Sequence, residues 1–71
     1  MKRPFFAYLI PDVGDTQTTR NFPDAISCQA HAKSEARHAL LRLKDADLIE
    51  VVVVENKTAV DGMSMMIGRT R

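Results

Sequence analysis

The sequence predicts an α+β fold in which one helix packs on a small, largely antiparallel sheet of three to four strands, in the order β-β-α-β(-β). Three observations support this prediction. Residues 48–56 include four consecutive valines, which are stiff at χ1 and suit a pleated strand. A second apolar run, residues 5–10, stops at Pro11 as strands often do. Between the two runs, residues 32–46 carry apolar side chains at helical spacing.

Length and composition limit the chain to one domain. With 71 residues there is no room for a second core, so residues 1–71 are expected to form a single domain. The apolar share of 45% and the charged share of 27% are ordinary for globular proteins and argue against intrinsic disorder. The net charge of +1 supports neither a strong nucleic-acid binder nor an acidic nucleic-acid mimic.

Cysteine usage and hydropathy predict a cytoplasmic protein. The single cysteine, Cys28, cannot form an intramolecular disulfide, whereas small secreted domains usually depend on several such bridges. Residues 5–10 are too few for the apolar core of a signal peptide. No stretch approaches the roughly 20 apolar residues of a membrane span.

The first strand and the valine strand are apolar on both faces. Side chains alternate across a strand. The two sides are Phe5, Ala7 and Leu9 against Phe6, Tyr8 and Ile10 in the first strand, and Ile49, Val51 and Val53 against Leu48, Val52 and Val54 in the valine strand. This shared character predicts that the two strands lie side by side in the middle of the sheet. One helix can cover only one face, so the other face needs a partner, a second layer or exposure to solvent.

Residues 11–31 are expected to hold turns and one or two further strands. Gly14 and several aspartates are turn formers. Residues 16–21 are either a mobile loop or a short edge strand. Residues 25–31 alternate between apolar and polar side chains, which predicts a half-buried strand.

The helix is expected from residue 32 or 33 to residue 44 or 46. Its N-cap is either Ala32 or Ser34. Leu41 projects among polar side chains, away from the core. The predicted core stripe spans about 120° and consists of Ala32, Ala36, Ala39, Leu40, Leu43 and Ala46.

The C-terminal part is expected to form a turn and a last strand. Asp61-Gly62 is a hairpin signal. Residues 63–67 are long enough for a short strand, which would return against the sheet. Residues 68–71 are expected to be a frayed basic tail.

No metal, cofactor or catalytic site is predicted. Cys28 and His31 have a C-x-x-H spacing, but a structural zinc site needs four ligands and His38 is the only other histidine. On the predicted strand, Cys28 and His31 point to opposite faces, which is unsuitable for a nucleophile and its base. Asp12, Asp15 and Asp24 lack the ordered spacing of a calcium loop.

The sequence is compatible with two kinds of binding surface, one for nucleic acid and one for a protein. Phe6 and Tyr8 on a sheet face, with basic residues nearby, resemble a platform for stacking nucleic-acid bases. Arginine and lysine can equally serve to solubilise the helix surface while the aromatic rings pack. Contact with a protein is the preferred interpretation, because contiguous exposed apolar surface usually marks an interaction site.

The layout and one junction resemble small proteins of phages and other mobile elements. Residues 30–36 pass directly from a predicted strand into the helix, with Ala36 on the inner face. This junction looks like that of compact β-β-α-β phage inhibitors, among them an inhibitor of bacterial RNA polymerase and several anti-CRISPR proteins. The resemblance covers about residues 5–56, and also residues 57–67 if the last hairpin forms. It implies a protein of the host bacterial cytoplasm that occupies a surface of a host machine.

A second resemblance, to HicB-like antitoxins, rests on residues 1–4 and on the F-P-D-x-x-x-C spacing of residues 22–28. The sequence departs from this family because Ser27 replaces the glycine before the cysteine. The segment from the cysteine to the helix is also shorter, and a DNA-binding domain is not expected. The resemblance implies an RNA-cleaving toxin as partner and a structural role for Cys28.

The sequence therefore predicts a non-enzymatic protein that binds and inhibits a bacterial host protein or protein–nucleic-acid complex, with no membrane contact. A HicB-like antitoxin and a small nucleic-acid-binding module are the alternatives. A homodimer whose open sheet faces pair is a third. The predicted binding residues are Phe6, Tyr8, Ile10, Val52, Val54, Arg37 and Leu41.

Overall fold

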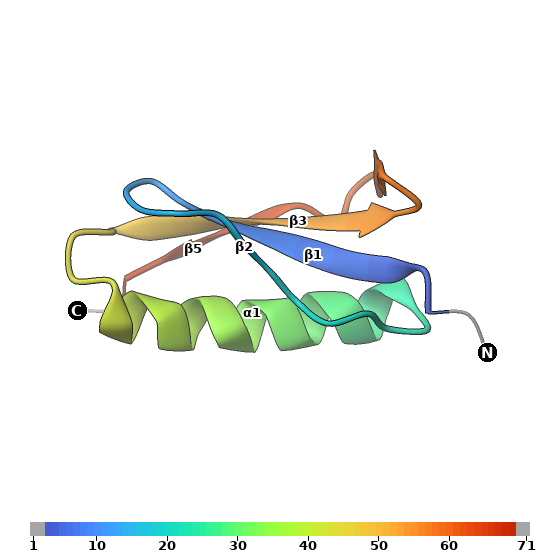
Figure 1. Cartoon of the computed structure of the whole chain (residues 1–71), viewed down its shortest axis with the longest axis horizontal. Helices are drawn as coiled ribbons and strands as arrows, with labels where there is room; N and C mark the ends of the chain where they lie inside the picture. Colours follow the sequence, from blue (N-terminus) through green and yellow to red (C-terminus); the bar gives the residue numbers. More distant parts are fainter. Residues whose placement is uncertain (1–2, 70–71) are drawn as a thin grey trace.

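Helix α1 (Ala25–Arg42) lies along one face of an antiparallel sheet (Figure 1). The computed structural model describes residues 3–69, and within them no helix lies on the opposite face of the sheet. The α+β fold with one helix and a small antiparallel sheet is therefore confirmed. The strands are β1 (Phe5–Pro11), β2 (Gln17–Thr18), β3 (Leu48–Glu55), β4 (Thr58–Ala59) and β5 (Met65–Gly68).

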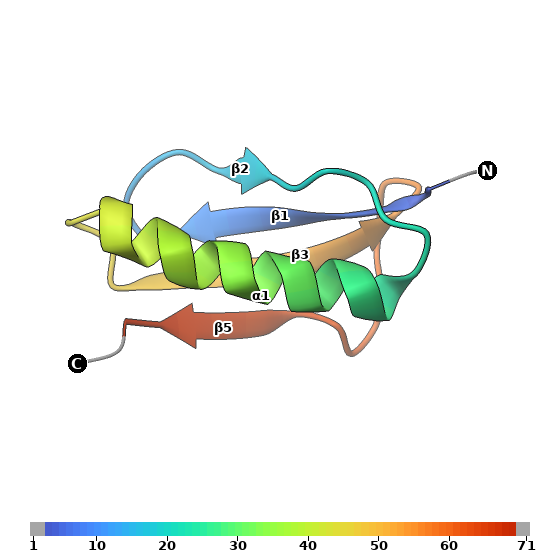
Figure 2. The same cartoon turned by 90° about the horizontal axis from the view of Figure 1, so that it is seen from below.

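Strands β1 and β3 form the centre of the sheet, as their two-sided apolar character predicts. They pair antiparallel over the whole of β1, from Phe5 opposite Glu55 to Pro11 opposite Ile49. Strand β2 borders β1, while β4 and β5 both pair with β3 at its other edge (Figure 2). The helix covers the face that carries Ala7, Leu9, Ile49, Val51 and Val53, all of which are buried.

The helix begins at Ala25, so the strand predicted for residues 25–31 is wrong, and so are both predicted N-caps. The strand-to-helix junction expected at residues 30–36 does not form either, because these residues lie inside α1. Asp24 is the N-cap: its carboxylate accepts hydrogen bonds from Ser27 N at 2.7 Å and from Ser27 Oγ at 3.1 Å. A capped backbone amide at this position favours helix over strand. The alternation of residues 25–31 is also compatible with helical spacing, since Ala25, Cys28 and Ala32 all face the core.

The chain between β2 and the helix runs along β1 and completes its outer edge. The buried Thr19 hydroxyl accepts a hydrogen bond from Ala7 N at 3.0 Å and donates one to Arg20 O at 2.8 Å. Phe22 then exchanges two backbone hydrogen bonds with Phe5. Of the two predictions for residues 16–21, the short edge strand is the one that forms, although it is limited to β2.

The C-terminal part forms two returns against β3. Asn56 and Lys57 have φ values of 48° and 72°, which is the geometry of a type I′ turn, and they connect β3 to β4. The final strand predicted for residues 63–67 is confirmed as β5. The prediction of a frayed tail is wrong for Gly68 and Arg69, because Gly68 belongs to β5 and Arg69 N bonds Asp47 O at 2.9 Å. Residues 70–71 lie outside the described residues.

Two polar side chains fix the end of the molecule where the helix meets β3. The Asp12 carboxylate accepts hydrogen bonds from Asp47 N at 3.0 Å and Leu48 N at 3.5 Å. The Arg69 guanidinium donates to the carbonyl oxygens of Leu43, at 2.8 Å, and of Ala46. A cation at this position satisfies carbonyl groups that the end of a helix leaves unpaired. These contacts join the loop after β1, the end of the helix and the end of β5.

Replacing the helix N-cap tests the corrected helix start. We expect Asp24→Ala to lower the free energy of unfolding by about 1 kcal/mol, because an amide of the first turn loses its acceptor. Asp24→Asn retains an acceptor and is the matched control, with a loss of only a few tenths of a kcal/mol. Urea denaturation followed by circular dichroism measures both. Equal losses for the two variants would contradict the capping role.

Candidate functional site

The face of the sheet that points away from α1 is the candidate functional site. It is called the open face here and consists of Phe6, Tyr8, Ile10, Leu48, Glu50, Val52, Val54 and Met66. The strand register sets these side chains in rows: Phe6 lies opposite Val54, Tyr8 opposite Val52, and Glu50 between Ile10 and Met66. Five residues predicted from the sequence, Phe6, Tyr8, Ile10, Val52 and Val54, therefore lie on one face of the sheet.

The open face combines exposed and half-buried apolar side chains. Met66 is 57% exposed and Tyr8 37% exposed. Phe6, Ile10 and Val52 are half-buried, although no layer of residues 3–69 lies above them. The rings of Phe6 and Tyr8 pack edge to face, with centroids 5.2 Å apart and planes at 72°. This lateral packing gives the surface a fixed shape before any partner binds.

Val54 shares the open face but does not form its accessible surface. Its side chain is only 4% exposed, and it lies outside the core beneath the helix. It pairs with Phe6 on one side and with Ala59 of the β4 return on the other. Val54 therefore supports the position of Phe6, and a direct contact with a partner would require the β3–β4 turn to move.

Arg37 and Leu41 belong to the other layer of the molecule and do not join the open face. Both lie on α1, where Leu41 is 76% exposed. Sequence reasoning missed a second exposed apolar residue of the helix, Ile26, because it placed this residue in a half-buried strand. The Asp24 cap signal, with a helical period counted from Ala25, could have identified it.

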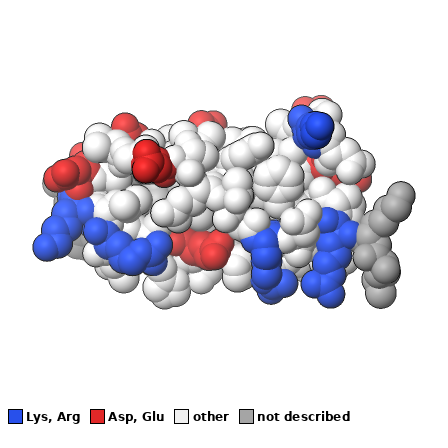
Figure 3. All heavy atoms as spheres, viewed as in Figure 1, with Lys and Arg blue, Asp and Glu red and all other residues white. Residues whose placement is uncertain are grey.

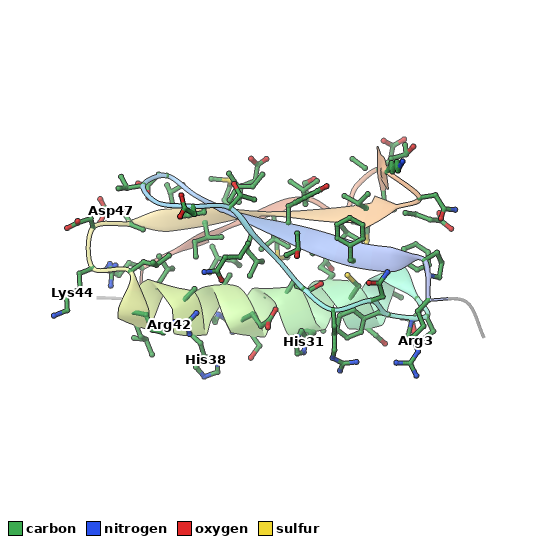
Figure 4. The ribbon with its side chains drawn as sticks, viewed as in Figure 1. Arg3, His31, His38, Arg42, Lys44 and Asp47 are labelled. Carbon is green, nitrogen blue, oxygen red and sulfur yellow. The ribbon has the colours of Figure 1, made fainter. Side chains whose placement is uncertain are left out.

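Basic groups concentrate on the helix side of the molecule. Arg3 points away from the sheet, and Arg42 and Lys44 lie at the level of the helix, as do His31 and His38 (Figure 4). The space-filling view shows the same separation, with most lysine and arginine atoms along the helix edge (Figure 3). On the open face, by contrast, the one charged side chain among the described residues is the carboxylate Glu50. The two sides of the molecule therefore differ in polarity.

One depression combines an aromatic ring with basic residues. It lies at the end of the sheet where β1 begins, and it is lined by Arg3, Pro4, Phe6, Asn21, Asn56 and Lys57. Asn21 donates a hydrogen bond to Arg3 O at 2.8 Å, which holds the chain before β1 in place. The depression adjoins the open face through Phe6 and is the feature that most favours nucleic-acid binding.

Cys28 is a buried residue of the hydrophobic core. Burial raises the pKa of the Cys28 thiol, the nearby Asp24 charge acts in the same direction, and a hydrogen bond with Thr19 opposes them. A raised pKa leaves little thiolate near neutral pH, which makes the thiol a poor nucleophile. The strand geometry expected for Cys28 and His31 is also wrong, since both lie on α1.

His31 is engaged with its own neighbours. Its ring lies 5.0 Å from that of the buried Phe22, and its Nε2 atom lies 3.4 Å from Glu35. Within residues 3–69, no group of three or more His, Cys, Asp or Glu side chains is arranged to hold a metal ion. In that same part of the chain, no helix combines the length and apolar character needed to cross a membrane.

No protein-family model matches the chain, and comparison with curated proteins and with solved structures also gives no match.

Substitution of two adjacent valines tests which face of β3 the helix covers. We expect Val53→Thr to lower the free energy of unfolding by about 1–3 kcal/mol, because it buries a hydroxyl in the core. Val52→Thr, on the open face, should change it by about 0.5 kcal/mol or less. Val52→Lys should also remain folded, whereas Val53→Lys should unfold. Thermal melting followed by circular dichroism ranks the stabilities of the variants. If the Val52 variants were less stable than the Val53 variants, the helix would lie on the other face.

Proposed function

We propose that the protein is a non-enzymatic binding protein that docks its open face onto a folded bacterial protein. The open face is the single observation that supports this proposal: a contiguous, laterally packed apolar surface is a typical protein interaction site. Tyr8 and Phe6 belong to the aromatic types that often anchor such interfaces. The fit between two preformed surfaces requires no catalytic chemistry.

The charge on the open face favours a protein partner over nucleic acid. Glu50 lies in the row between Ile10 and Met66, so a phosphate backbone laid across this face would meet a carboxylate. The basic residues that could attract phosphates lie mostly on the helix side (Figure 3). The partner surface that fits is apolar and carries a lysine or arginine opposite Glu50.

The specific form of this proposal is a phage or mobile-element protein that inhibits a bacterial host complex in the cytoplasm. The supporting features are the small size of the chain and its α+β layout, which is similar to that of compact phage inhibitors. Several groups that could perform chemistry have structural roles here. Asp12 and Asp24 bind backbone amides, and Cys28 is buried. Inhibition then results from occupying a surface that transcription or CRISPR-type machinery needs.

Affinity capture from bacterial lysate tests the docking surface. We expect the tagged wild-type protein to retain a specific protein partner, and we expect Val52→Lys to lose it. Ile26→Lys is the matched control, because it makes the same change at an exposed β-branched residue on the helix side. A partner retained equally by Val52→Lys, or the absence of any specific partner, would contradict the proposal. Inhibition is tested by adding the wild type and Val52→Lys to assays of the purified partner.

A nucleic-acid-binding module is the second candidate, favoured by the depression around Phe6, Arg3 and Lys57. An aromatic ring beside cationic side chains can stack a base while the cations bind phosphates. The observation against it is that Phe6 is half-buried and already packs against Tyr8.

Fluorescence anisotropy with single-stranded DNA and RNA oligonucleotides distinguishes the two candidates. We expect no binding at physiological salt, because Arg3 and Lys57 are the only cations among residues 3–69 that line this depression. Binding that weakens with added salt and is lost in Lys57→Glu, but not in Lys44→Glu, would instead establish the nucleic-acid module. Lys44 is the control because it lies near the opposite end of the molecule, after the helix (Figure 4).

The HicB-like antitoxin and the homodimer are the remaining alternatives, and each has its own test. In a HicB-like antitoxin, the F-P-D-x-x-x-C segment would have a structural role. This is compatible with the structure, in which Phe22 and Cys28 are buried and Asp24 caps the helix. Copurification with an RNA-cleaving toxin would support that alternative. In a homodimer, two open faces would pair, and sedimentation of a monomer at high concentration would exclude it.

A further inference from the structure

Strand β5 is an edge strand, and within residues 3–69 its outward backbone groups have no hydrogen-bond partner. It bonds β3 with Ile67 opposite Ile49 and Met65 opposite Val51. Because Arg69 N bonds Asp47 O in the same register, the alternation of an antiparallel ladder directs the amides and carbonyls of Met65 and Ile67 toward β3. Those of Met66 and Gly68 point away from the sheet.

The edge at β5 lacks the protection that the other side of the sheet has. Along the outer edge of β1, β2 and the Phe22 backbone satisfy the polar groups, and the Thr19 hydroxyl bonds Ala7 N. The β5 sequence, Met-Met-Ile-Gly, contains no proline and no charged residue. Natural edge strands usually carry such features to prevent pairing with other chains. This edge is therefore suited to accept another strand.

The helix presents a basic flank beside this edge. Gln29 Nε2 bonds Met63 O at 2.8 Å, which fixes the flank of α1 that faces the chain leading to β5. One helical turn apart on the same flank follow Lys33 and Arg37, and Leu41 continues the row. A depression between helix and strand is lined by Arg37, Leu40, Leu41, Gly68 and Arg69. This flank and the free edge together form a groove.

The opposite flank of the helix has a different character. Glu35 is the one acidic residue of α1, and it lies with His38 and Arg42 against Gln17 and Thr18 of β2. No carboxylate of the helix therefore offsets Lys33 and Arg37 beside β5. The groove next to β5 is cationic and partly apolar.

We propose that an extended segment of another protein, with acidic side chains at alternate positions, adds to the free edge of β5 beside Lys33, Arg37 and Leu41. Its backbone pairs with the outward groups of Met66 and Gly68, as in other cases of strand addition to a sheet edge. Alternate side chains point toward the helix layer, where carboxylates meet the two cations. This site lies at the edge of the sheet and adjoins the open face at Met66, and strand addition there is a second mode of binding beyond the proposed function.

Charge also decides between a foreign strand and a second copy of the chain. Antiparallel pairing of two β5 strands about a twofold axis would bring two basic flanks to the same junction, and like charges disfavour such pairing. An acidic segment gains attraction at the same positions. The partner that fits is therefore an acidic extended segment.

Peptide binding by fluorescence anisotropy tests this proposal. The probe is a labelled nine-residue peptide in which valine and glutamate alternate, and the control peptide has lysine in place of glutamate. We expect the glutamate peptide to bind at least tenfold more tightly than the lysine peptide, and Arg37→Glu to remove or reverse this preference. Equal binding of both peptides, or no binding of the glutamate peptide, would overturn the proposal.

A backbone substitution tests strand addition directly. Met66→Pro removes one outward amide that does not pair with β3, whereas Met66→Ala retains it. We expect the proline variant to lose at least tenfold in affinity for the glutamate peptide and the alanine variant to bind as the wild type does. Equal affinities of the two variants would overturn the proposal, as would a dimer in sedimentation that Met66→Pro dissociates.

Amide hydrogen exchange in the wild-type protein supplies a readout that does not depend on the folding of any variant. Saturation with the glutamate peptide should slow exchange at Met66 and Gly68, with little change at Ile67, whose amide is already paired with β3. Protection confined to other parts of the chain would overturn the proposal.

Discussion

The antiparallel pairing of β1 with β3 is the interaction on which the rest of the structure depends. Both strands are apolar on both faces, and they pair along the full length of β1. A chain of 71 residues supplies one helix, which covers Ala7, Val51 and Val53. The second face of the same ladder consequently remains at the surface with its apolar rows intact. The fold and the candidate site thus have the same cause: the chain is too short to cover both apolar faces of its two central strands.

The contact between helix and sheet is built from small residues. Ala32, Ala36 and Ala39 are buried against the sheet, so the helix axis can approach the strands closely, and Leu40 fills space near the end of the helix. Such a contact buries less area per residue than one made of large side chains. Polar groups at the ends therefore matter for stability, in particular the Asp24 cap and the bonds that Asp12 and Arg69 make to backbone groups.

Much of this architecture could be predicted from local signals. β-Branched and aromatic runs identified β1 and β3, and their period of two placed Phe6, Tyr8, Ile10 and Val52 on one face. The start of the helix could not be recognised by alternation, because residues 25–31 fit both periods and Asp24 resembles a turn former. Long-range packing also escaped prediction: Val54 is buried because the chain returns as β4, and Ile26 is exposed because the helix starts early.

The valines of β3 raise a question of register, since a strand with apolar residues at every position from Val51 to Val54 could slip by one residue and still present valines to the helix. The slipped pairing would turn Glu50 toward the helix and bury its carboxylate at considerable cost. It would also separate the Leu48 amide from the Asp12 side chain. Glu50, the one acidic residue of the open face, thus helps to determine the register of the sheet. It favours the native pairing of β1 with β3 over the pairing shifted by one residue, although the valines would fit both.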